Sequence, residues 1–397
     1  MRRRVGRVAG AVTGLALTMT TGCKGFFVYP GSTNNGSSSA SGDYVYVASA
    51  GSQTANSQTL TGFSVSAGAL TEVTAPAYSL PFIPTAVAVN PADTILFVAG
   101  NGTISAFSIL SGGGLSVLNS SVATGSPDVI SMDISPDGNW LIALDGTGST
   151  AGVVSIDEFQ ITSNASVLTA NGRTTYNVST NAILPRAIKF SPNGELLCAA
   201  LGTAGDLMYT FTSESSSGAL TGSLTNPQTI SAPATPMSDN GLGWSADSST
   251  LYIARSNSTS NGEVAVYSVS GGSFGASYSF YATGVQPTAV AVNTVGTNEY
   301  VYVANQSDST ISGFSVGSNG ALNALSGSPY TAGLGVGALA VDRTGDYLLA
   351  AALGGTPDLE LFSFDSQFAG RLDPSATALT GAGILEPAGA VALATTH

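Results

Sequence analysis

The sequence predicts an all-β protein, a seven-bladed β-propeller, and three observations lead to this fold class. The first is composition, because 49 of 397 residues are Gly, only 9% are charged and 43% are hydrophobic. Long surface helices need the Glu, Lys and Arg that are scarce here, and a disordered chain would hold fewer β-branched and aromatic residues. The second is a unit that recurs seven times at intervals averaging about 51 residues. The third is a pair of complementary strand motifs at the two ends of the repeat region.

Each repeat opens with a first strand rich in Ala and Val that often follows a proline. Pro84–Asn90 shows it clearly, and Pro287–Asn293 repeats it almost letter for letter. A tight turn and a second apolar run follow, and Asp137-Gly138 and Asn193-Gly194 are strong hairpin signals because Gly tolerates a positive φ. Related first strands end at Ser135, Ser191, Ser245, Asp342 and Ala394. The second apolar runs that follow these first strands are 95–99, 140–144, 196–200, 251–254, 300–304 and 347–351.

A third strand carries an aromatic residue in every repeat. Six of the seven repeats have an apolar residue two positions later, which is the period of a strand. Gly-Ala-Leu turns such as Gly68–Leu70 and Gly320–Leu322 then open a short fourth strand. The aromatic positions are Phe63, Phe107, Phe159, Phe211, Tyr267, Phe314 and Phe362.

Four strands repeated seven times predict a β-propeller. The repeat region begins with a second-strand motif, Tyr44–Ala48, and closes with a first-strand motif, Pro387–Leu393. We therefore expect the C-terminal strand to complete the blade that the N-terminus begins, which leaves no open sheet edge there. A β-solenoid is the alternative, but its coils are shorter and lack this four-part pattern.

The N-terminus predicts export. Arg2, Arg3, Arg4 and Arg7 form a positive region before an apolar stretch, 8–20, which is too short to span a bilayer. The segment ends in Thr20-Thr21-Gly22-Cys23, which resembles a bacterial lipobox although Thr20 stands where Leu is preferred. An ordinary cleaved signal and an uncleaved segment are the alternatives.

We accordingly expect three parts in the chain. Residues 1–22 are a lipoprotein-type signal peptide, 23–42 a flexible Gly/Ser/Asn-rich spacer that begins with lipidated Cys23, and 43–397 the propeller. The protein is then exported and lipid-anchored to the bacterial cell envelope. Cys198 has no expected partner and is interpreted as a small buried hydrophobe.

Charge restricts the partners. The net charge is −13, and removal of the four N-terminal arginines leaves 7 basic against 24 acidic residues, or −17. Such an acidic protein does not follow nucleic acid by charge, and it contacts a membrane only through its anchor. We expect a monomer with no cofactor, and the candidate ligands are a small anion, a polysaccharide or a protein.

A family resemblance rests on one repeat above all. Tyr300–Asn305, Thr310–Val316 and Gly320–Leu322 resemble the bacterial YVTN-repeat propellers, which are grouped with the seven-bladed lactonase family named after 6-phosphogluconolactonase. The resemblance covers Tyr44–His397 and implies the propeller fold, with lactone hydrolysis as the implied activity.

The catalytic residues of that family are not matched. Family lactonases and the related muconate-cyclising propeller are described as using His, Arg and Glu near the axis. The only His of this chain, His397, is its last residue, and we expect it to be frayed and a poor general base. Imidazole metal sites, Ser-His-Asp chemistry and Cys-His chemistry are unsupported for the same reason.

Topology predicts which polar residues share one end of the propeller. First strands begin where second strands end, and we expect this end to face the ligand. Arg186, Asp239 and Arg255 come from neighbouring repeats and are expected to meet near the axis mouth, where two arginines suit a carboxylate or phosphate. The alternative is that Arg186 pairs with Asp239 and only joins two blades. The expected residues of this end are Asp128, Arg186, Asp239, Arg255, Asp308 and Glu386.

Lys189 and Asp133 occupy one register in adjacent repeats, where other repeats place Ala. Charged groups at an inner position need pairing or water, so we expect a structural pair lining a wet axial channel. The alternative is a catalytic role with Lys189 as a perturbed base. The corresponding small residues are Ala88, Ala291, Ala340 and Ala392.

The remaining polar residues have simpler interpretations. Asp137, Asn193, Arg343 and Asp346 are expected to be solvated turn residues. The acidic stretches 133–137 and 305–310 do not match an EF-hand loop, so no metal site is predicted. Trp140 and Trp244 are expected to pack in the core.

Two functions follow as hypotheses. The first is a lipid-anchored binding or scaffolding module without catalysis. The second is a lactone hydrolase of the 6-phosphogluconolactonase type with an Arg-containing site at the axis mouth. Fold alone does not choose between them.

Overall fold

The computed structural model describes residues 42–51, 58–74, 77–124, 128–146, 152–162, 167–178, 182–216, 219–230, 237–257, 260–381 and 389–397. The predicted signal segment, Cys23, all of the predicted spacer except Gly42, and Glu386 lie outside these residues. Within the described ranges, no helix is long and apolar enough to cross a membrane.

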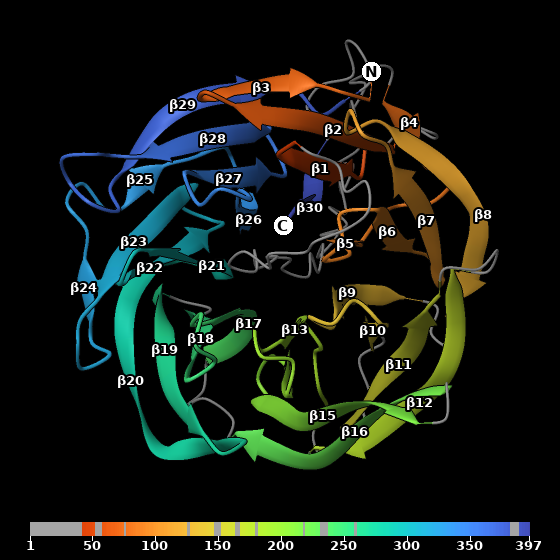
Figure 1. Ribbon diagram of the computed structural model, residues 1–397. Helices are drawn as coiled ribbons and strands as arrows, with labels where there is room; N and C mark the ends of the chain where they lie inside the picture. The colour runs from red at the N-terminus through yellow and green to blue at the C-terminus, as the bar shows by residue number, and fades with distance from the viewer. Residues whose placement is uncertain are drawn as a thin grey trace, which may run out of the picture.

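Seven antiparallel sheets surround a central axis, as the sequence predicted (Figure 1). Blade 1 contains β30 (Ala390–Thr395), β1 (Tyr44–Ser49), β2 (Thr59–Ser66), β3 (Ala69–Glu72) and β4 (Tyr78–Ser79). Blade 2 contains β5 (Ala86–Val89), β6 (Ile95–Gly100), β7 (Thr103–Ile109) and β8 (Leu115–Ala123). Blade 3 contains β9 (Val129–Ile134), β10 (Trp140–Asp145), β11 (Val153–Ile161) and β12 (Leu168–Asn177).

The other four blades repeat this order. Blade 4 contains β13 (Ala187–Phe190), β14 (Leu196–Ala200), β15 (Asp206–Ser216) and β16 (Ala219–Ile230). Blade 5 contains β17 (Met237–Trp244), β18 (Thr250–Asn257), β19 (Asn261–Ser270) and β20 (Ser273–Val285). Blade 6 contains β21 (Pro287–Val295), β22 (Asn298–Asn305), β23 (Thr310–Val316), β24 (Leu322–Ala324) and β25 (Tyr330–Thr331). Blade 7 contains β26 (Val336–Val341), β27 (Tyr347–Ala352), β28 (Leu359–Phe364) and β29 (Leu372–Ala378).

The two ends of the propeller differ in their connections. The innermost strands β5, β9, β13, β17, β21, β26 and β30 lie nearest the axis (Figure 1). We call the end where these strands begin the loop end, because connections from the preceding blade arrive there. The opposite end, with the hairpins between first and second strands, is the turn end. In the hairpin of blade 3, Gly138 has a φ of 74°, and Asn139 N donates to Asp137 Oδ1 at 3.0 Å.

Blade 1 closes the ring with strands from both ends of the chain. β1 pairs antiparallel with β30, with Tyr46 opposite Ala394. The Tyr44 amide donates to Thr396 Oγ1 at 2.9 Å, and the Thr396 amide donates back to Tyr44 O at 2.9 Å. Gly42 and His397 both lie at the turn end, because β1 is a second strand and β30 a first strand.

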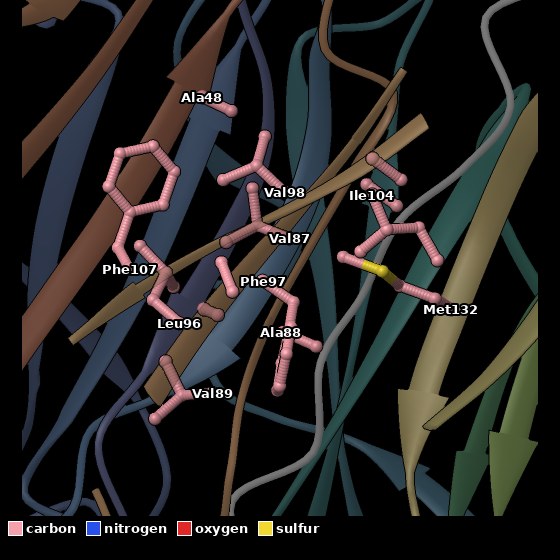
Figure 2. Close-up of a cluster of buried hydrophobic side chains, with 14 of the residues drawn as sticks. Ala48, Val87, Ala88, Val89, Leu96, Phe97, Val98, Ile104, Phe107 and Met132 are labelled. Atoms are coloured by element: carbon pink, nitrogen blue, oxygen red, sulfur yellow. The ribbon is translucent and has the colours of Figure 1, made fainter. Parts of the chain in front are cut away.

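The core lies in the seams between blades, because both faces of every sheet are covered by a neighbour. Figure 2 shows side chains of β5, β6 and β7 in blade 2, among them Phe97, packed with Ala48 of β1 in blade 1 and with Met132 of β9 in blade 3, so this cluster fills two neighbouring seams. Trp140 and Trp244 are fully buried in two other seams, which confirms their predicted packing role.

Outermost strands depart from the short fourth strand that was expected. β16 has 12 residues and β20 has 13, whereas blade 6 has two short pieces, β24 and β25, in the same place. Outer strands face solvent on one edge, and packing restrains their length less than that of inner strands.

Candidate functional site

Asp239 and Arg255, two of the three residues expected to meet, are in contact. They lie opposite each other on β17 and β18, and Arg255 Nε donates to Asp239 Oδ1 at 2.6 Å. Arg255 also reaches Glu263 Oε1 at 3.2 Å and the Tyr267 hydroxyl at 3.3 Å, both on β19. Arg255 is 1% exposed and Asp239 0% exposed. The guanidinium is therefore engaged within blade 5 and inaccessible to solvent.

A second carboxyl group adjoins this ion pair from the neighbouring blade. Asp206, at the start of β15, is fully buried, and its carboxyl group adjoins that of Asp239, with which it shares a hydrogen bond. Burial raises the pKa of Asp206 well above its ordinary value, and the charge of Asp239 raises it further. The pKa of Asp239 is also raised by burial, but Arg255 opposes that effect. We assign the proton of this pair to Asp206, because Asp239 accepts the Arg255 hydrogen bond.

The same carboxyl groups act on the buried thiol nearby. Cys198 is a buried free cysteine, as predicted. Burial raises the pKa of its thiol well above the ordinary value, and the charges of Asp206 and Asp239 add to the effect. A protonated thiol is a poor nucleophile and metal ligand, so Cys198 serves as packing.

The other residues expected at the loop end are more exposed. Arg186 and Asp128 are half-buried, and the Arg186 amide donates to Ala200 O within blade 4. Asp308 is exposed, and its Oδ2 accepts the Val285 amide at 2.6 Å. The ion pair of Asp239 is with Arg255 of its own blade. This pairing differs from the expected alternative, in which Arg186 and Asp239 join two blades.

Lys189 and Asp133 lie on adjacent inner strands, β13 and β9. Asp133 Oδ2 accepts the Phe190 amide at 2.7 Å, and Oδ1 accepts the Ile134 amide at 3.0 Å. Burial lowers the pKa of Lys189 to about 8, against the opposing charge of Asp133. Burial raises the pKa of Asp133, while Lys189 and the two amides oppose the rise. Asp133 thus accepts a hydrogen bond from a backbone N–H of β13, the inner strand of the next blade, and it also faces the ammonium group of Lys189.

His397 is bonded at the turn end, so the expectation that it frays is wrong. Its backbone amide donates to Asp93 Oδ1 at 2.8 Å, and its Nδ1 lies 3.2 Å from the same oxygen. Arg343 Nη1 lies 3.0 Å from Asp93 Oδ2. Asp93 therefore links blade 2 to the C-terminal segment of blade 1 and to the β26–β27 turn of blade 7. The other turn residues, Asp137, Asn193 and Asp346, are exposed as predicted, and so is Arg343.

The sequence contains a signal for Asp93 that the prediction missed. Asp93 occupies the turn position that Gly138 fills in blade 3, and its φ is 54°. A non-Gly residue in the left-handed region costs about 1–2 kcal/mol, and Asp is among the side chains that tolerate it best. The ion pair with Arg343 and the hydrogen bond from the His397 amide offset this cost. Asp206 was missed because only first and second strands were assigned to the loop end, although third strands begin there too.

A further ion cluster lies in blade 3, away from the axis. Arg173 Nε donates to Asp157 Oδ1 at 2.7 Å, and Arg173 Nη1 lies 3.6 Å from Asp145 Oδ2. Across the described residues, no group of three His, Cys, Asp or Glu side chains is arranged to hold a metal ion.

Comparison with known proteins establishes the fold alone. No family model and no curated protein matches the chain. The periplasmic gluconolactonase of Pseudomonas aeruginosa matches with a TM-score of 0.64 and 16% identity, over 89% of this chain and 99% of that one. A Bacteroides fragilis protein provisionally assigned as a 6-phosphogluconolactonase matches with a TM-score of 0.65 and 16% identity, over 91% and 100% of the two chains.

Other matches carry different names. The hydrazine synthase of Kuenenia stuttgartiensis matches with a TM-score of 0.53 and 14% identity, over 86% of this chain and 96% of that one. The protein is thus a seven-bladed β-propeller structurally similar to lactonase-family propellers. Because a protein named for other chemistry also matches, the fold does not decide the activity.

Proposed function

We propose that this protein is an exported, lipid-anchored β-propeller that acts as a binding or scaffolding module without catalysis. The observation that carries the proposal is the engagement of Arg255. Its guanidinium contacts Asp239, Glu263 and Tyr267 in a buried network, so the arginine expected to recognise a substrate anion stabilises blade 5 instead. Removing Arg255 from this contact to bind a substrate would leave the buried charge of Asp239 uncompensated, which is strongly unfavourable.

The location is proposed from the N-terminal sequence. The positive segment, the short apolar stretch and Cys23 support export and lipid attachment. The described chain begins at Gly42, at the turn end, so the tether joins the domain there. The proposed partners are a small anion, a polysaccharide or a protein.

Lactone hydrolysis is the second candidate, and one observation favours it. The periplasmic gluconolactonase of P. aeruginosa has the same architecture over 89% of this chain. Arg186, which is half-buried at the loop end, is the remaining arginine of the expected group that could meet a substrate carboxylate.

Acid release from a panel of lactones separates the two candidates. We expect the purified protein and its Arg186→Ala variant to hydrolyse every lactone at the spontaneous rate. Turnover well above that rate, lost in the variant, would establish the lactonase and contradict the non-catalytic proposal.

Lipid attachment is tested separately by labelling with radioactive palmitate in a bacterial host. Label on the parent and its absence from Cys23→Ser are the expected results. An unlabelled parent would contradict the anchor without bearing on catalysis.

A further inference from the structure

Three aliphatic side chains are exposed at the loop end, each shortly before an inner strand. Ile83, Leu184 and Leu334 lie just before the inner strands β5, β13 and β26, and they are 52%, 42% and 64% exposed. We call these three residues the loop-end rim. Isolated exposed aliphatics are ordinary on protein surfaces. Ile83 and Leu184 occupy equivalent positions three residues before their strands, and Leu334 lies two residues before β26, so three blades each expose an aliphatic side chain at this end.

The backbone of each rim residue is held in place by its own blade. The Leu184 amide donates to Leu201 O at 3.2 Å, and Leu334 O accepts the Gly354 amide at 2.9 Å. A Cβ on Gly100 would lie 2.2 Å from Ile83 O, so this contact requires glycine at the end of β6. The residues before Ile83 and Leu184, namely Phe82 and Ile183, are buried. The loops are therefore anchored, and the rim side chains project into solvent from fixed positions.

The rim residues are distributed around the axis. They belong to blades 2, 4 and 7, which are separated by two, three and two steps around the ring. The apolar surface extends further in blade 7, where Leu353 adjoins Gly335 and where Leu379, after β29, is 45% exposed. One partner lying across the axis mouth would reach all three blades.

The charge at this end indicates the chemistry of the partner. Asp128, Glu263, Asp308 and Glu360 are at least partly exposed there. In the described part of the chain, the partly exposed cations near this end are Arg186 and Arg173, and Arg173 lies between two carboxylates. The surface thus combines aliphatic side chains with net negative charge, which complements a segment carrying aliphatic and basic residues.

We propose that the loop-end rim is a docking surface for a cationic, amphipathic segment of a partner protein. The proposal rests on the proposed function as a binding module and specifies its surface and the chemistry of its partner. The described chain begins at Gly42, at the end opposite the loop-end rim.

A labelled 18-residue peptide of Leu and Lys in amphipathic order is the probe, and fluorescence anisotropy measures its binding to the full exported chain. We expect saturable binding that salt weakens, and at least tenfold weaker binding by the variant Ile83→Ser/Leu184→Ser/Leu334→Ser. The matched control replaces three residues of the turn end by Ser and is expected to bind within twofold of the parent. These control residues are Leu110, Val295 and Phe368, which are 50%, 49% and 52% exposed.

Several outcomes would overturn the proposal. They are an absence of saturable binding by the parent, equal losses in both triple variants, and equal binding of a peptide with Glu in place of Lys. Leu334→Ser alone, at the most exposed rim position, tests the surface if the triple variant does not fold. A lactone turnover would refute the non-catalytic function without changing these binding results, so the two failures are distinguishable.

Discussion

Replacing Asp206 by Asn removes a buried acid whose proton, by our assignment, is part of the fold. Asp206 lies beside Asp239, and burial raises its pKa well above the ordinary value. The folded protein therefore holds a proton that the unfolded chain releases above a pKa of about 3.9. The parent should lose stability as pH rises from about 4 towards the raised folded pKa, by about 1.4 kcal/mol per pH unit for this one group.

The amide introduced at position 206 is neutral at every pH and can still donate to the free oxygen of Asp239. We therefore expect Asp206→Asn to gain stability relative to the parent as pH rises above about 4, by about 1.4 kcal/mol per pH unit until the raised folded pKa of Asp206 is reached. With a urea m-value of about 3 kcal/mol/M, the difference between their midpoints changes by about 0.5 M per pH unit in that range. The assay is urea unfolding at several pH values, followed by Trp fluorescence and circular dichroism, whose midpoints must coincide.

Asp239→Asn is the matched control, with the opposite expectation. It removes the carboxylate closest to the buried Arg255, and breaking such a pair costs about 3–5 kcal/mol. The reasoning fails if the parent and Asp206→Asn give parallel stability curves against pH. It also fails if Asp206→Asn is destabilised as much as Asp239→Asn, because Asp206 would then be the ionised partner.

Three further predictions concern other contacts. Asp93→Asn keeps a side chain suited to φ 54° but removes the negative charge that faces Arg343, so thermal unfolding should show a loss of stability of about 1–3 kcal/mol. The control Asp346→Asn, at an exposed turn position, should stay within about 0.5 kcal/mol of the parent. Lys189 has a folded pKa of about 8, below its unfolded value of about 10.4. Between these two pH values the unfolded chain binds more protons than the folded one, so the titration of Lys189 makes the stability of the parent rise with pH. In urea titrations at pH 8, 9 and 10, Lys189→Met should lack this rise. Trp140→Ala should cost about 3–5 kcal/mol in urea unfolding, and a loss under 1 kcal/mol would contradict the packing described for its seam.

The blade architecture was predictable because every inner strand obeys the same physical constraint. Ala, Val and Gly crowd near the axis, hairpins need a residue that tolerates positive φ, and alternation places one aromatic of each third strand in a seam. Tyr44–Ala48 and Pro387–Leu393 likewise predicted the closure through β1 and β30. These patterns are local in sequence and repeat seven times, so each repeat supports the interpretation of the others.

Contacts at the axis were less predictable, because they depend on which neighbour a long side chain selects. Register placed Asp239 and Arg255 at the loop end, but it did not show that Arg255 would also engage Glu263 and adjoin Asp206 across a seam. His397 was misjudged for a related reason. Position at the end of a chain favours fraying, whereas its actual contact comes from Asp93, some 300 residues away in sequence.

Most Lys and Arg side chains in the described part of the chain pair with carboxylates of the protein itself, and this pairing limits which ligands the surface can bind. Of the six Lys and Arg residues in the described part of the chain, Arg173, Arg255, Arg343 and Arg371 form ion pairs with carboxylates, and Lys189 faces Asp133. Acidic residues outnumber these cations, so the exposed remainder of the charge is negative. A surface with few accessible cations is poorly suited to anionic ligands. This distribution of charge favours a basic protein partner over the small anion among the proposed ligands, and the Leu/Lys and Leu/Glu peptides test that choice directly.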